Sequence, residues 1–141
     1  MSPLIHRIWA ERERANAHYV PIATPPGPGA LAAATKALSA LGFSGCNVTL
    51  PHKETALAIA DRATPAARRA GAANMLTFTG DGVEADNSDV EGFAESVRSL
   101  APGRRALVLG AGGAARAVVV ALESLGVEDI VIANRSAARG A

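Results

Sequence analysis

The sequence predicts an α/β protein: a mostly parallel α/β domain, followed by the start of a second α/β unit. Three observations support this. Hydrophobic residues make up 49% of the 141 positions and charged residues 19%, which is enough apolar material for a core. Short apolar runs of strand length alternate with segments of helical period. A glycine-rich turn joins an apolar run to a helical segment near the C-terminus. Aromatic residues are only 4% of the chain, so we expect close packing through small side chains.

Composition also excludes several classes of protein. The net charge of +1 argues against a nucleic-acid partner or a polybasic membrane patch. The apolar stretch 106–122 is interrupted by glycines and Arg116, and the N-terminal residues lack the pattern of a secretory signal. The single cysteine, Cys46, excludes an internal disulfide framework. We therefore expect a cytoplasmic protein that binds neither nucleic acid nor membrane.

The first third of the chain is predicted to hold two helices and a strand. Ser2 and Pro3 suit the cap and first position of a helix. Residues 18–23 are predicted to form a short strand before a Pro/Gly-rich loop at 24–29. Leucines at helical spacing then predict a second helix that ends at Gly42.

The middle of the chain is predicted to contain three strands and two helices. Residues 45–50 read as a strand, and residues 53–62 as the helix after it. Residues 74–78 and 83–85 form a predicted hairpin, because Thr-Gly-Asp-Gly lies between them. A further helix runs from Asn87-Ser88-Asp89 to about residue 100.

A domain boundary is predicted at Ala101-Pro102-Gly103, giving domains 1–101 and 102–141. Beyond it, residues 106–109 and 130–133 are predicted buried strands on either side of a helix at 114–125. This arrangement is one βαβ unit.

The glycine turn between this first strand and helix fits the G-x-G-x-x-A pattern. Its six positions are Gly110, Ala111, Gly112, Gly113, Ala114 and Ala115. The first glycine permits a tight turn, the second lets a pyrophosphate approach the helix N-terminus, and the small final residue allows close packing. We predict dinucleotide binding here; the alternative is a glycine turn with a purely steric role.

The end of the second strand of this unit indicates which dinucleotide binds. An NAD site usually has an acidic residue there, whereas this chain has Asn134-Arg135-Ser136, with Arg139 following. Asp129 lies before the strand, where it is poorly placed for this role. A guanidinium suits the 2′-phosphate of NADP, so we predict NADP as the cofactor. The alternative is an ordinary solvated arginine.

Polar residues gather at the end of the predicted strand 45–50. Its alternation places Asn47 and Thr49 on one face, and Val48 and Leu50 on the other. Lys53 follows at a helix start, an unusual position for a structural lysine because the helix N-terminus carries positive partial charge. Acid–base chemistry is one interpretation of this lysine, and a solvated side chain is the other.

Two more polar groups lie at the ends of predicted elements. Asn74 follows Gly71-Ala72-Ala73 at the entry to a strand, and Asn87-Ser88-Asp89 begins a helix. Helix capping alone is a sufficient explanation for the second group. Together with Asn47, Thr49 and Lys53, however, these groups favour one shared polar pocket.

In order along the chain, several motifs resemble those of the shikimate dehydrogenase family. They are Ser2-Pro3-Leu4-Ile5-His6, Asn47-Val48-Thr49-Leu50-Pro51-His52-Lys53, Gly71-Ala72-Ala73-Asn74, Asn87-Ser88-Asp89 with Gly92-Phe93, the glycine turn, and Asn134-Arg135-Ser136. The resemblance implies a substrate domain followed by a Rossmann-type NADP domain. It also implies the reversible NADPH-dependent reduction of 3-dehydroshikimate to shikimate, in the pathway to chorismate and the aromatic amino acids.

The resemblance also implies roles for individual residues. Lys53 would be the catalytic lysine and Asp89 its paired carboxylate. The substrate-binding residues would be Ser2, Asn47, Thr49, Asn74 and Ser88. No metal is implied. Met75 and Ser88 stand where the family usually has threonines, so Ser88 keeps the hydroxyl and Met75 loses it.

Family members usually have a strand and another serine before Ser-Pro, and they continue well beyond the Asn-Arg segment. We therefore expect this chain to be a fragment that lacks the first strand and part of the cofactor domain. Two alternatives remain open: a quinate/shikimate dehydrogenase variant, and an inactive truncated homologue that binds only ligand or a partner. The expected assembly is a monomer or homodimer.

Overall fold

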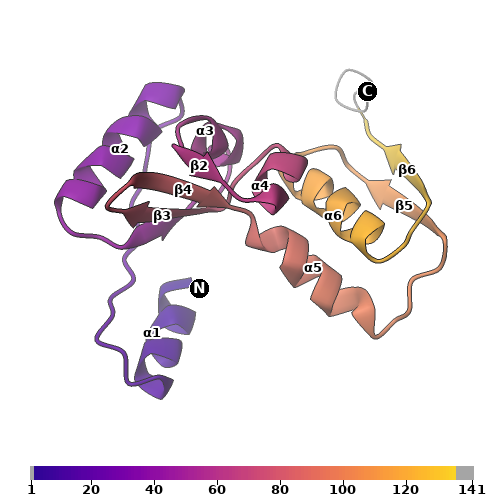
Figure 1. Cartoon of the computed structure of the whole chain (residues 1–141), viewed down its shortest axis with the longest axis horizontal. Coiled ribbons are helices and arrows are strands. Elements are labelled where there is room, and N and C mark those ends of the chain that lie inside the picture. The colour runs from indigo at the N-terminus through magenta and orange to yellow at the C-terminus, as the bar shows by residue number, and fades with distance from the viewer. Residues whose placement is uncertain (1, 136–141) are drawn as a thin grey trace.

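A computed structural model describes residues 2–135 as two sheets at opposite ends of the molecule (Figure 1). Between them lie three helices, α4 (Pro65–Ala70), α5 (Ser88–Arg98) and α6 (Gly113–Ser124). The α/β class predicted from the sequence is confirmed.

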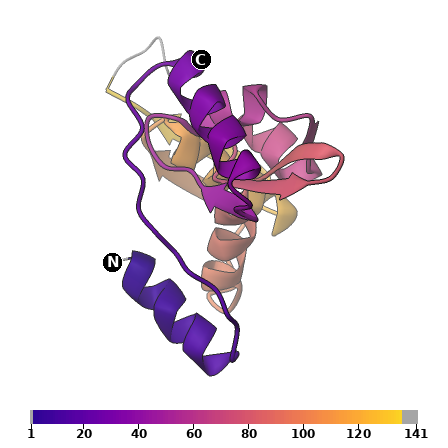
Figure 2. The ribbon, with the colours of Figure 1, turned by 90° about the vertical axis from the view of Figure 1, so that its left-hand side faces the viewer.

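The N-terminal helix α1 (Ser2–Arg12) stands apart from the first sheet, at the end of a long extended segment (Figure 2). It begins where the serine and proline predicted, but it buries none of its residues. The strand predicted at 18–23 is wrong: these residues pair with no described strand. Alternating apolar residues do not make a strand unless a neighbouring edge supplies hydrogen bonds.

The next helix, α2 (Pro28–Ala40), ends as predicted. Gly42 follows it with φ of +82°, a left-handed conformation that costs glycine little. The Gly42 N–H donates to the carbonyl of Ser39 at 3.0 Å, which satisfies one of the last carbonyls of the helix.

The first sheet has four strands in the order β1-β3-β4-β2: β1 (Gly45–Asn47), β3 (Met75–Thr79), β4 (Gly82–Asp86) and β2 (Arg62–Ala63). The predicted hairpin is confirmed as β3 and β4, with Thr79 opposite Gly82. β2 runs parallel to β4, whereas the pairs β1–β3 and β3–β4 are antiparallel. The sheet is therefore mixed.

Two predicted boundaries in this half need correction, and one helix was not predicted. β1 ends at Asn47 rather than residue 50, because the chain turns so that the His52 N–H donates to the Thr49 carbonyl. α3 (Lys53–Ala58) is shorter than predicted, and Arg62 belongs to β2. The helix α4 was not predicted, although Thr64, Pro65 and Gly71 occupy its cap, first and closing positions.

The second sheet consists of β5 (Arg105–Leu109) and β6 (Asp129–Ala133), which are parallel and joined by α6. The predicted βαβ unit is therefore confirmed. Its strands are not buried as predicted, because Val108 is the only buried residue of β5 and β6. Val108 faces the helix and is buried with Leu122 and Val127, while Leu107 and Leu109 are exposed.

The two halves meet through small side chains. Ala70 of α4, Ala94 of α5, and Ala117 and Ala121 of α6 are almost completely buried in one cluster. Alanines let helix axes approach closely, as the composition predicted. The segment between α5 and β5 has no helix or strand, and the boundary near residue 101 stays a prediction. Within residues 2–135, no helix is long and apolar enough to cross a membrane.

Candidate functional site

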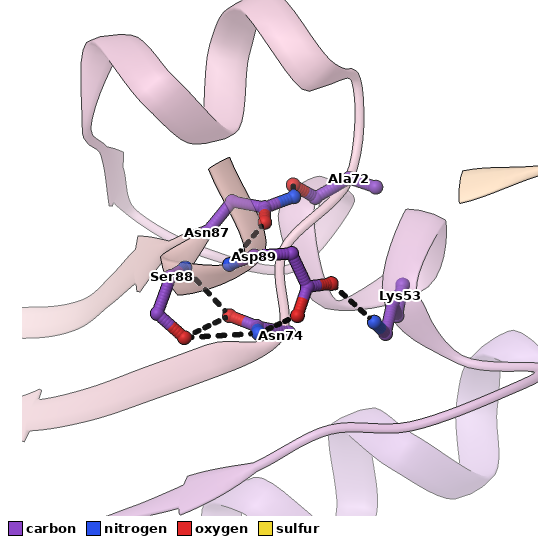
Figure 3. Close-up of polar contacts among 6 residues, drawn as sticks. All are labelled: Lys53, Ala72, Asn74, Asn87, Ser88 and Asp89. Carbon is purple, nitrogen blue, oxygen red and sulfur yellow. Dashed lines mark hydrogen bonds and ion pairs between the residues drawn. The ribbon is translucent and has the colours of Figure 1, made fainter. Parts of the chain in front are cut away.

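The central contact of the site joins the first residue of α3 to the first turn of α5. The ammonium of Lys53 donates to Oδ2 of Asp89 at 2.6 Å (Figure 3). Their side chains are 15% and 36% exposed, so the pair is partly shielded from water. A fully exposed ion pair contributes at most about 1 kcal/mol to stability, because water competes for both charges. Water competes less for this pair, since both side chains are partly shielded.

Asp89 is the second residue of α5, but its carboxylate does not cap that helix. The cap is Asn87, whose Oδ1 accepts the Asp89 N–H at 3.1 Å. Asn87 is only 1% exposed, and its Nδ2 donates to the carbonyl of Ala72 at 2.8 Å. Capping therefore explains Asn87, whereas the side chain of Asp89 is directed to Lys53 and Asn74. The second bond of Asn87 was not foreseen, because its partner lies on another loop.

The amide of Asn74 completes this group. Its Nδ2 donates to Oδ1 of Asp89 at 2.8 Å and to Oγ of Ser88 at 3.0 Å, and its Oδ1 accepts the Ser88 N–H at 2.9 Å. We call Lys53, Asn74, Ser88 and Asp89 the closed cluster, because their polar groups bond to one another (Figure 3).

The other three candidate substrate residues lie together elsewhere. Ser2, Asn47 and Thr49 line a cavity of about 500 Å³ between α2, β1 and the segment 18–24. No hydrogen bond within residues 2–135 engages their side chains, and we call them the open cluster. The predicted alternation holds for buried Val48 and fails for Leu50, which is 74% exposed beyond the strand end.

The open and closed clusters come closest along the chain at Thr49 and Lys53, and they share no residue. Lys53 and Asp89 do not line the cavity of the open cluster, whereas His52, next to Lys53, does. His52 is buried, and its Nε2 contacts the Thr24 carbonyl at 3.2 Å. This contact ties the Pro/Gly-rich loop to the start of α3.

The glycine turn lies between β5 and the N-terminus of α6. Gly110 has φ of +107°, and its N–H donates to the carbonyl of Ala133 at 2.8 Å. Gly112 is the N-cap of α6, and because it has no side chain it does not cap the N–H groups of the first turn. A Cβ placed at Gly110 or Gly112 would meet no atom of residues 2–135 within 4 Å outside its own chain neighbours. Ala115 packs on the cluster beneath β5. These residues fit a dinucleotide.

The residues expected at the 2′-phosphate are only partly described. The bond from Gly110 to Ala133 brings the end of β6 beside the glycine turn, and Asn134 and the exposed Arg135 follow directly. Ser136 and Arg139 lie outside the described residues.

Two further observations limit the chemistry of the described region. Residues 2–135 hold no group of three or more His, Cys, Asp or Glu side chains able to bind a metal ion. Burial raises the pKa of the Cys46 thiol, which disfavours the reactive thiolate.

Comparison with known proteins identifies similar sequences and structures. The sequence model of one protein family, the shikimate dehydrogenase substrate binding domain, matches residues 1–76. Shikimate dehydrogenase (NADP(+)) of Acidiphilium cryptum is 45% identical over 141 residues, and that of Roseobacter denitrificans is 48% identical over 144. Both alignments cover 98% of this chain, and they cover 50% and 51% of the relatives. The chain thus spans about half the length of these curated relatives.

Among solved structures, shikimate 5-dehydrogenase of Thermus thermophilus, in complex with NADP(H) and shikimate, superimposes with a TM-score of 0.88. It is 37% identical in sequence, and the match covers 99% of this chain and 52% of that one.

Proposed function

The chain belongs to the shikimate dehydrogenase family, and on this premise we propose that the protein carrying it interconverts shikimate and 3-dehydroshikimate with NADP. The observation that carries the proposal is the bond of 2.6 Å between Lys53 and Asp89. The relatives named above and the Thermus thermophilus complex support the choice of substrate and cofactor.

Within this reaction, Lys53 acts at the reacting oxygen. NADPH, when bound, supplies a hydride to the carbonyl carbon of 3-dehydroshikimate. Negative charge then builds on the carbonyl oxygen, and Nζ of Lys53 donates the proton that completes the hydroxyl. Asp89 holds the ammonium through its Oδ2 contact, so the lysine side chain is oriented before substrate arrives. In the reverse direction, Lys53 accepts the proton of the hydroxyl.

The open cluster recognises the substrate in this proposal. Shikimate carries three hydroxyls and a carboxylate, so it offers many hydrogen-bonding groups. Ser2, Asn47 and Thr49 line one cavity, and their side chains have no hydrogen-bonding partner among residues 2–135, so they suit those groups. A pocket that bonds hydroxyls discriminates strongly against analogues that lack them.

The cofactor role falls to the second unit. The glycine turn, with residues 110–115, would hold the pyrophosphate, and Asn134, Arg135, Ser136 and Arg139 would surround the 2′-phosphate. On this division residues 1–101 form the substrate domain and residues 102–141 the start of the NADP domain. A cytoplasmic location and a monomeric or homodimeric state remain predictions.

The test is oxidation of shikimate by a hybrid in which this chain replaces the matching half of the Acidiphilium cryptum relative. We expect NADP to support turnover far better than NAD, because Arg135 suits a 2′-phosphate. Equal efficiency with both would overturn the cofactor assignment, and preference for quinate would favour the variant enzyme. Binding of shikimate without turnover would indicate an inactive homologue.

A further inference from the structure

Two ion pairs within residues 2–135 join α6 to helices of the first half of the chain. Nη1 of Arg116 on α6 lies 3.3 Å from Oε1 of Glu54 on α3. Nη2 of Arg69 on α4, the helix beside α6 in Figure 1, lies 2.6 Å from Oε2 of Glu123. The four side chains are between 48% and 66% exposed, so the two pairs have similar access to water. The pairs differ in what they connect.

The two pairs lie at opposite ends of one face of α6. Arg116 is the fourth residue of the helix and Glu123 the eleventh. Positions seven apart lie on the same side of a helix, about 10 Å from each other along its axis. The N–H of Arg116 donates to the carbonyl of Gly112 at 3.2 Å, which closes the first turn of α6 on its N-cap. Arg116 is therefore anchored to the glycine turn, whereas Glu123 lies at the far end of the helix.

Glu54 connects the first of these ion pairs to Lys53. The two residues are the second and the first of α3. The carbonyl of Lys53 accepts the N–H of the buried Ala73 at 2.8 Å, so the segment 71–73 holds the start of α3. The contact between Glu54 and Arg116 thus links the residue after Lys53 to the first turn of α6.

The same short segment also contacts α6 and α5. Gly71 ends α4 with φ of +62°, and a Cβ there would lie 3.3 Å from Nη1 of Arg116. A Cβ at Gly113, the first residue of α6, would lie 3.8 Å from the Cβ of Ala72. The carbonyl of Ala72 accepts Nδ2 of Asn87, the cap of α5. The segment therefore contacts the starts of α3, α5 and α6.

The position of the pair between Arg116 and Glu54, rather than its strength, indicates its role. Exposed ion pairs add little to stability, because water competes for both charges. Reaction rates are far more sensitive to placement, and a displacement of about 1 Å can lower a rate about 100-fold. This pair connects the element that would hold NADP to the element that begins with Lys53. Arg69 and Glu123 connect α4 to the far end of α6 and reach neither place.

We propose that Arg116 and Glu54 are positioning residues that hold the glycine turn at a fixed place relative to Lys53. The kinetic consequence rests on the proposed function, whereas the contact itself exists without ligand. Arg116→Gln and Glu54→Gln should each lower kcat about two- to fivefold, the range expected for an exposed ion pair, and change KM for shikimate little. The matched controls are Arg69→Gln and Glu123→Gln, which break the other ion pair of α6.

The first test needs no turnover and follows backbone hydrogen exchange by mass spectrometry in the hybrid protein. We expect Glu54→Gln to speed exchange in residues 112–118 about two- to fivefold, because the first turn of α6 loses its contact with α3. Arg116→Gln should do the same for residues 53–58. Glu123→Gln should leave both segments unchanged. If neither segment responds, or if Glu123→Gln accelerates them equally, the proposal is wrong.

The second test is a charge-reversal cycle on kcat. Arg116→Glu and Glu54→Arg each place like charges together and should slow the hybrid enzyme. The two combined restore an ion pair and should recover most of the rate. Reversal of Arg69 and Glu123, singly or together, should change kcat little. Losses that multiply in the double variant, or equal losses from the control pair, would contradict a positioning role for Arg116 and Glu54.

Titration with NADP alone separates this role from direct binding of the cofactor. If the pair acts by positioning, Arg116→Gln and Glu54→Gln should change the Kd for NADP similarly, by less than about twofold. A large loss with Arg116→Gln only would identify Arg116 as a phosphate ligand and overturn the proposal. If the hybrid is folded but does not oxidise shikimate, the proposed function fails, and the exchange measurement still decides whether the pair holds the turn.

Discussion

The open and closed clusters differ in what their polar groups already contact. In the closed cluster, Asp89 joins Lys53 and Asn74 by bonds of 2.6 and 2.8 Å. In the open cluster, Asn47 and Thr49 line a cavity of about 500 Å³, and their side chains form no hydrogen bond within the described part of the chain. The closed cluster is therefore organised before any ligand binds. In the open cluster, a ligand can replace the water that the polar side chains would otherwise bind. Changes in the closed cluster should therefore act on turnover, and changes in the open cluster on affinity.

The largest effect is expected at Lys53. Lys53→Ala should lower kcat of the hybrid enzyme at least about 100-fold, the usual contribution of a positioned acid or base. KM for shikimate should change much less. The matched control is Lys36→Ala, since Lys36 is the only other lysine, exposed on α2. If the Lys53→Ala enzyme is folded and keeps most of its kcat, this lysine has no catalytic role and is only a charged residue at the start of α3.

A smaller effect is expected outside both clusters, at Arg135, which follows the end of β6. Arg135→Ala should weaken NADP binding by about 1–3 kcal/mol, the loss of a charge-assisted contact, with little effect on NAD. Titration of both cofactors into the hybrid checks this. Arg12→Ala, an exposed change at the end of α1, is the control. Similar losses for NADP and NAD would show that Arg135 does not read the 2′-phosphate.

Thr49→Ala tests the open cluster directly. The change removes a hydroxyl that bonds ground and transition states alike, so KM should rise by roughly two- to tenfold with kcat nearly unchanged. Steady-state kinetics with shikimate measures both constants. A fall in kcat without a rise in KM would show that Thr49 contributes to the chemical step and not to substrate binding.

The smallest effect concerns Cys46, which precedes Asn47 on β1. Burial raises the pKa of its thiol, so less thiolate is present at neutral pH than for a free thiol. Alkylation by iodoacetamide should be slow near neutrality and reach half its maximal rate at a higher pH than for a small free thiol. Faster alkylation than that of the free thiol would show that this face of β1 is open as well.

Local signals in the sequence were sufficient for much of the fold. The hairpin of β3 and β4, the βαβ unit and the C-terminal end of α2 follow from turn residues and helix-ending signals that act over a few positions. The strand predicted at 18–23 failed because strand formation depends on a partner that local alternation does not supply. The helix α4 was missed although its local signals are present. Thr64, Pro65 and Gly71 are typical helix-end residues, but the six residues between the caps are too few to show a helical period.

The site was predictable in its residue types and less so in its contacts. Lys53 and Asp89 are 36 residues apart, and each was recognisable only as a polar residue at a helix start. Their pairing was implied by family resemblance, and tertiary structure creates it. The engagement of Asn74 with Ser88 and Asp89 could not be read from sequence, because nothing local distinguishes Asn74 from Asn47.

The most direct test of the central claim is a double-mutant cycle on kcat for Lys53 and Asp89 in the hybrid enzyme. Asp89→Asn removes the charge that holds the ammonium and should slow turnover by itself. Because the two side chains act as one unit, Asp89→Asn combined with Lys53→Ala should be little slower than Lys53→Ala alone. Circular dichroism of each variant confirms that it is folded. Effects that multiply in the double variant would contradict the account, because two independent groups would then be at work.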